Sequence, residues 1–237
     1  MKKELIIATV LAATSVFALE SNSVSFLPVS NPPSTTQDGK NLMLLSLPFK
    51  GYGSDSVNVA DVLVTDTLSA GDVLYVPTAT KGTYDQYTLA SGKASWTPGK
   101  KVTINASGVP VAGSSDSATE ATIPRGQPFW LKTAATNVKL LGELPTQTKT
   151  SVTVTTDNNG YKLVAPTTTE QVITLGSLKE AAGTGDLIIL ANGTRYQKVS
   201  SGWKLMPART AASDDIVISA GTGFWYKANN AARTLSL

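Results

Sequence analysis

The chemistry open to this chain is limited first by two residue types that it lacks. Its 237 residues include no Cys and no His. Without Cys there is no disulfide, no thiolate zinc site and no cysteine nucleophile. Without His there is no Ser-His-Asp triad and no imidazole ligand for a transition metal. Acid–base chemistry would therefore depend on carboxylates, and we predict no cofactor and no metal site.

The best-matched carboxylates are Asp72 and Asp186, because each follows a glycine and precedes an apolar run. A glycosidase needs two carboxyl groups roughly 5–10 Å apart, so a carboxylate-based glycan hydrolase stays open as an alternative function. A plainer role for an aspartate after glycine is to accept hydrogen bonds from its own turn. We favour that role and predict that the protein is not an enzyme.

Aromatic side chains form the second set of candidates. A tryptophan that faces outward from a strand can stack on a sugar ring, whereas one that faces inward closes the core. Glycines precede the Phe-Trp pairs, and the other two tryptophans also follow a glycine and precede a proline. We favour core packing. The residues that could instead bind a ligand are Trp130, Trp225, Tyr226, Trp96 and Trp203.

These candidates recur because the chain contains two copies of one pattern. Gly71-Asp72 and Gly185-Asp186 each begin a copy of the apolar run, and each copy then continues to a tryptophan and closes with a Phe-Trp pair. Matched landmarks in the same order indicate a duplication. The first copy is longer, mostly around Thr78–Thr83 and Lys100–Thr119, and we expect the second of these segments to form a long loop or an excursion of β-structure.

Short apolar and alternating runs predict that both copies consist mostly of strands. Val73–Val76 and Leu187–Leu190 have the continuous apolar character of buried strands, and Val152–Thr156 alternates as a half-exposed antiparallel strand does. Helix is scarce, and Val59–Leu63 and Ser177–Ala182 are each expected to form about two turns.

The predicted fold is therefore mainly β, with two similar β-rich units, sandwich- or barrel-like, in tandem and one short helix in each. The predicted boundaries are residues 19–138 for the first unit and 139–237 for the second.

The N-terminus has the pattern of a secretory signal peptide. Two lysines precede the mostly apolar stretch Leu5–Phe17, and a small residue at Ala18 follows. We predict that residues 1–18 are a signal peptide and that the protein is exported to the periplasm, the cell surface or the medium. The apolar stretch is too short to span a membrane, and we expect no membrane span after cleavage.

The charge pattern limits the partners. Lys+Arg 20 against Asp+Glu 17 leaves a net charge of +3, and charged residues make up 16% of the chain. Because lysines and arginines are scattered singly, we expect no nucleic-acid partner. Self-association and a surface polysaccharide are the partners that the sequence leaves open.

At the Gly-Asp strand and the Gly-x-Gly-Phe-Trp-Tyr-Lys ending the sequence resembles a group of exported bacterial tandem β-repeat proteins, in which a Gly-x-x-Trp turn also recurs. Residues 221–227 carry this ending, whereas in the first copy Pro128 stands at the second glycine and Leu131 at the tyrosine. The group has no established activity. The resemblance therefore implies export and β-repeats but no site.

Together these observations lead to one functional hypothesis. We expect a secreted bacterial protein of the cell surface or extracellular matrix with a non-catalytic structural or binding role, which could include self-assembly. Duplication favours this role because a second similar surface adds avidity. The alternatives are a carbohydrate-binding module that uses exposed aromatic residues and the carboxylate-based glycan hydrolase.

Overall fold

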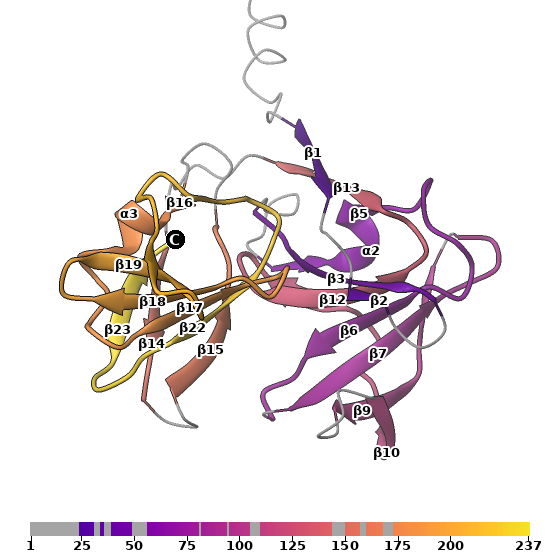
Figure 1. Ribbon diagram of the computed structural model, residues 1–237. Helices are drawn as coiled ribbons and strands as arrows, with labels where there is room; N and C mark the ends of the chain where they lie inside the picture. Colours follow the sequence, from indigo (N-terminus) through magenta and orange to yellow (C-terminus); the bar gives the residue numbers. More distant parts are fainter. Residues whose placement is uncertain are drawn as a thin grey trace, which may run out of the picture.

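The computed structural model describes ten stretches of the chain. These are residues 24–30, 34–35, 39–48, 56–80, 82–93, 95–104, 110–143, 150–156, 160–167 and 173–237. The predicted signal peptide lies outside the described residues. Figure 1 shows two lobes, one coloured indigo to pink and the other orange to yellow.

Strands from the first half of the chain build a large antiparallel sheet, here called the first sheet. Its strand order is β10-β9-β7-β6-β12-β3-β2, with β8 paired to β7. Its strands are β2 (Ser34–Thr35), β3 (Asn41–Ser46), β6 (Val73–Pro77), β7 (Thr83–Leu89), β8 (Trp96–Pro98), β9 (Lys100–Ile104), β10 (Pro110–Asp116) and β12 (Pro128–Thr133). Two small sheets accompany it, formed by β1 (Val24–Ser30), β13 (Asn137–Glu143) and β5 (Leu63–Val64), and by β11 (Thr122–Pro124) and β4 (Ser56–Asn58).

Strands from the second half build the second sheet, in the order β15-β22-β17-β18-β19-β20. Its strands are β15 (Tyr161–Val164), β17 (Leu187–Leu190), β18 (Arg195–Val199), β19 (Gly202–Met206), β20 (Thr210–Ala211) and β22 (Phe224–Lys227). Two small pairs accompany it, β14 (Ser151–Val154) with β23 (Arg233–Ser236), and β16 (Ile173–Thr174) with β21 (Val217–Ile218). The prediction of a mainly β fold is confirmed.

The strand with the Phe-Trp pair holds the same position in both large sheets. β12 lies between β3 and β6, and β22 lies between β15 and β17. In each sheet the strand after the Gly-Asp turn also forms a hairpin with the next strand, β6 with β7 and β17 with β18. The second extra segment of the first copy is the hairpin of β9 and β10 at the end of the first sheet, so the expected β-excursion is confirmed.

Each large sheet buries one face in its own hydrophobic cluster. In the first, Phe129 and Leu131 point inward from β12, and in the second Phe224 and Tyr226 do so from β22. Since successive side chains of a strand point to opposite faces, the intervening Trp130 and Trp225 lie on the other face of their sheets. The same alternation makes β14 a half-buried strand, as predicted, with Val154 inward.

The two helices are shorter than the expected two turns. α2 spans Val59–Val62 and α3 spans Leu175–Leu178, four residues each. α3 begins before the predicted start because Thr174 caps it. The Thr174 hydroxyl accepts a hydrogen bond from the Ser177 amide, and the Ser177 hydroxyl accepts one from the Thr174 amide. This reciprocal capping box fixes the N-terminus of the helix.

The Gly-x-Gly ending of the second copy contacts the first sheet. Thr222 forms an antiparallel bridge with Leu45, and the Ser46 amide donates to the Gly221 carbonyl at 2.9 Å. A Cβ on Gly223 would lie 2.8 Å from the Pro128 Cβ. The corresponding segment of the first copy lies against the second half, where the Arg125 side chain donates to the Thr167 carbonyl at 3.4 Å.

A methyl group at Gly223 should destabilise this contact between the two halves. The Pro128 ring cannot rotate away from a Cβ at that distance, so we expect Gly223→Ala to lower the free energy of unfolding by about 1–3 kcal/mol. Gly92→Ala is the control, since an added Cβ there meets nothing within 4 Å. Urea denaturation followed by circular dichroism measures both variants, and equal stability of the two would contradict a close-packed contact.

Candidate functional site

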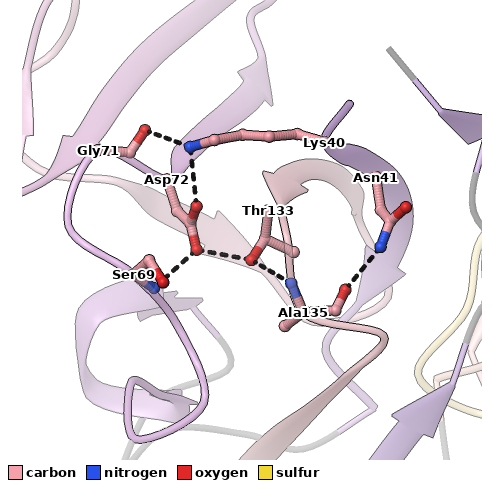
Figure 2. Close-up of polar contacts among 7 residues, drawn as sticks. All are labelled: Lys40, Asn41, Ser69, Gly71, Asp72, Thr133 and Ala135. Carbon is pink, nitrogen blue, oxygen red and sulfur yellow. Dashed lines mark hydrogen bonds and ion pairs between the residues drawn. The ribbon is translucent and has the colours of Figure 1, made fainter. Parts of the chain in front are cut away.

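Asp72 lies at the turn that leads into β6, and its side chain is fully buried (Figure 2). Its Oδ2 accepts hydrogen bonds from the Ser69 amide at 2.9 Å and from the Thr133 hydroxyl at 2.6 Å. Its Oδ1 pairs with the Lys40 ammonium at 3.1 Å. Lys40 also donates to the Gly71 carbonyl at 3.2 Å, so one cation holds both residues of the Gly-Asp turn.

Asp186 holds the matching position before β17 and is also fully buried. Its Oδ2 accepts from the Gly183 amide at 2.8 Å, the Tyr226 hydroxyl at 2.7 Å and the Arg233 Nε at 2.8 Å. Its Oδ1 accepts from the Asn229 amide at 2.8 Å. Like Asp72, this carboxylate combines an amide three residues earlier, a hydroxyl from the Phe-Trp strand and a distant cation.

These contacts set the protonation of Asp186. Burial opposes the charged form, but the hydrogen bonds from Asn229, Tyr226, Gly183 and Arg233 together outweigh it and hold the pKa of Asp186 below its usual value. Burial, followed by the hydrogen bond to Asp186, raises the pKa of Tyr226. At neutral pH the site is therefore a carboxylate stabilised by a neutral phenol and a guanidinium.

Both aspartates thus hold turns. Each oxygen that would exchange a proton with a substrate is already hydrogen-bonded to the protein, and neither side chain is exposed. Each residue also lies beside its own large sheet, at the start of β6 or of β17. The geometry supports the favoured turn role over a pair of cooperating carboxyl groups.

Three of the five aromatic candidates belong to the hydrophobic clusters. Tyr226 is fully buried, Trp203 is 2% exposed and Trp96 is 9% exposed. The Trp203 indole donates to the Leu175 carbonyl at 2.8 Å and so ties β19 to α3. Burial of this extent favours the packing role for these three residues, because a ring inside the core presents no face to a ligand.

Trp130 and Trp225 are half-buried and lie on the opposite sheet faces from the clusters. Trp130 is in register with Leu44 on β3 and Tyr75 on β6. Both neighbours are buried, at 1% and 7% exposed. Trp225 is likewise in register with Leu163 on β15 and Ile189 on β17, but there both neighbours are only half-buried.

The register of the second sheet extends these neighbours into two rows, which we call the open face. The first row consists of Leu163, Trp225, Ile189, Arg195 and Met206. The second row consists of Tyr161, Lys227, Leu187, Gln197, Lys204 and Ala211. None of these side chains is buried. Along these rows the outer side of the second sheet is accessible to solvent.

Sequence reasoning identified Trp225 but missed the cations around it. Lys227, Arg195 and Lys204 stand on three different strands, and each alternates with an inward-facing residue of its strand. The period-two alternation around Tyr196 and Trp203 contained the signal. Their assembly on one face depends on the hairpin registers, which single residue positions do not specify.

Within the described part of the chain, no cluster of three or more acidic side chains is placed to hold a metal ion. No helix among those residues has the length and apolar character needed to cross a membrane. Comparisons with protein-family models, with curated proteins and with solved structures found no match.

Asp186→Asn should destabilise the second half strongly. It leaves Arg233, whose side chain is 18% exposed, without its charge partner, and we expect a loss of about 2–4 kcal/mol in the free energy of unfolding. Asp214→Asn is the matched control, because Asp214 forms its 2.8 Å pair with Lys179 at the surface. There we expect a loss below about 1 kcal/mol. Equal losses would contradict the structural role of Asp186.

The difference in stability between wild type and Asp186→Asn should also depend on pH. Because the pKa of Asp186 is lowered in the folded state, its charged form stabilises the fold above the unfolded pKa of about 3.9, and this contribution is lost as the pH falls through the folded pKa. The stability difference between wild type and Asp186→Asn should therefore shrink from pH 7 to about pH 2. Urea midpoints at the two pH values measure it.

Proposed function

We propose that the chain is an exported tandem of two β-rich units with a non-catalytic structural or binding role at the cell surface or in the extracellular matrix. The predicted boundary between residues 19–138 and 139–237 falls inside β13, which pairs with β1 and β5, so we assign β13 through Glu143 to the first unit. The equivalent placement of β12 and β22, and the four-residue helices α2 and α3 that follow β4 and β16, support the two-unit arrangement. The occupied oxygens of Asp72 and Asp186 argue against carboxylate catalysis.

The proposal that the protein self-associates rests on strand β10. It is the terminal strand of the first sheet, and all seven of its residues are exposed. Natural proteins protect such edges with charged side chains, above all lysine, with proline inside the strand or with β-bulges. In β10 the charged residue is Asp116, which is paired with Lys100 at 2.7 Å, and the proline stands at the first position. The pairing with β9 shifts register after Ala112, so Pro110–Ala112 is the regular part of this edge.

A carbohydrate-binding role is the second candidate. The observation that favours it is the half-buried Trp225 on the open face, between Leu163 and Ile189. An amphipathic, half-exposed ring with apolar neighbours suits stacking on a sugar. Both roles are compatible with a surface protein, and each has its own residues.

Val111→Lys should weaken self-association. Val111 is 47% exposed in the regular part of β10, and a lysine there opposes pairing with another strand. We expect wild type to show a mass above that of the monomer at high concentration in size-exclusion chromatography with light scattering, and Val111→Lys to shift it toward the monomer. Val217→Lys, at a 53% exposed valine of β21, should leave the association unchanged. A monomeric wild type at every concentration would refute association through β10.

The predicted export can be tested by the N-terminus and the intact mass of the exported protein. If residues 1–18 are removed by signal peptidase, the exported protein begins at Leu19, and its intact mass should correspond to residues 19–237. Substituting Ala18 with a bulky residue such as Trp should prevent cleavage at this position. An exported protein that retains Met1 would contradict the signal peptide.

A further inference from the structure

The open face of the second sheet combines a flat apolar centre with positive charge. Its first row places the Trp225 ring between Leu163 and Ile189 and continues to Arg195. Adjacent strands are about 4.8 Å apart, so the backbone of Arg195 lies two strands, about 10 Å, from that of Trp225.

The charges on this face have one sign. Lys227, Arg195 and Lys204 are its ionisable side chains apart from the phenol of Tyr161, and the two rows contain no carboxylate. None of the three cations forms an ion pair with a carboxylate in the stretches that the structure describes. The Lys227 ammonium instead lies 5.1 Å from the centre of the Tyr161 ring, so a cation–π contact keeps it beside the apolar centre.

The corresponding face of the first sheet differs. There the neighbours of Trp130, Leu44 and Tyr75, are buried, and Gly223 lies against Leu44. The first sheet thus has a tryptophan in the position of Trp225 without an open row around it, and this row is an internal control for the open face. Lys132, in the position of Lys227, is in register with Leu42 and Val73, which are only half-buried.

We propose that the open face binds a linear anionic polysaccharide, such as a polyuronate, with a sugar ring stacked on Trp225 and acidic groups paired with Lys227, Arg195 and Lys204. This inference rests on the binding role proposed above and names its ligand. Gln197, between Leu187 and Lys204 in the second row, supplies an amide for the sugar hydroxyls.

Two other polyanions fit this face less well. The longer, second row crosses six strands and extends about 24 Å. A nucleic-acid strand carries one phosphate every 3.4 Å, so over that length it has more than twice the charge that three cations balance. Acidic peptide motifs are typically recognised by clusters of arginines, whereas the two rows contain a single arginine, Arg195. A glycan with one carboxylate on each sugar carries less charge per unit length than a nucleic-acid strand, and its apolar ring faces suit the tryptophan.

The test compares two polymers with one backbone. Polygalacturonate carries a carboxylate on each sugar, and its fully methyl-esterified form has lost the charge but keeps the rings. By isothermal titration calorimetry, we expect the full exported chain to bind polygalacturonate at least tenfold more tightly than the ester, with an affinity that falls as salt is raised. Equal affinity for both polymers, or no binding to either, would overturn the proposal.

Variants then test the residues. Arg195→Gln with Lys204→Gln alters an exposed and a half-buried surface side chain and should lower the affinity about tenfold or more with circular dichroism unchanged. Trp225→Ala should lower it as well. Trp130→Ala and Lys132→Gln are the matched controls on the first sheet and should bind as wild type does. Binding that survives the double variant, or that the controls reduce equally, would contradict the assignment to the open face.

Two additional measurements separate this inference from the proposed function. Tighter binding to single-stranded DNA or to polyglutamate than to polygalacturonate would overturn the choice of a glycan but leave a binding role intact. Shortening of the polygalacturonate chains during incubation would refute the non-catalytic role itself. If the protein binds neither polymer, leaves the polygalacturonate chains intact and still self-associates, only the glycan site is refuted.

Discussion

The fold depends on a negative charge buried at the start of a central strand of each large sheet. A carboxylate removed from water is strongly unfavourable unless its oxygens are hydrogen-bonded and a cation compensates it. Asp186 meets this requirement with four donors drawn from Gly183, Tyr226, Asn229 and Arg233. Because those donors come from the preceding turn, from β22 and from the segment up to β23, the charge fixes the relative positions of three elements. The buried charge therefore constrains the conformation of the Gly-Asp turn and the packing of the sheet together.

The two halves satisfy that constraint with different residues. In β22 the hydroxyl comes from Tyr226, whereas the equivalent position in β12 is Leu131, which has none to offer. Thr133, two residues further along β12, points to the same side of the strand and donates to Asp72 instead. The cation changes in the same way, from Arg233 after the strand to Lys40 before β3. Each half thus compensates its buried carboxylate with hydrogen bonds and a cation, although the donor residues differ. This is expected when the buried charge, rather than any single partner, determines how the turn and the sheet pack.

Much of this architecture could be predicted from the sequence, because its signals are local. The Gly-Asp turns, the alternation of Val152 and Val154 and the inward role of Trp203 all follow from residues a few positions apart. The partners Lys40 and Arg233 could not be predicted, since they lie 32 residues before Asp72 and 47 after Asp186. The start of α3 was missed because Thr174 and Ser177 form a reciprocal cap. The open face was missed because it depends on register across six strands, and a shift of one residue in any hairpin would turn its cations inward.

The same alternation links the core to the outer surface. In β22 the residues that fill the core and hold Asp186, Phe224 and Tyr226, alternate with Trp225 and Lys227 on the open face. The buried network therefore also orients the outward side chains, because the strand cannot rotate without removing Tyr226 from its carboxylate. The difference between the two outer faces follows from what covers them. Gly223 lacks a side chain and so lies against Leu44 and Pro128 of the first sheet, whereas the rows of the second sheet stay accessible. The first half thus contributes the part of its outer face around Leu44 to the contact between the halves, whereas the second half presents the two rows of the open face to solvent.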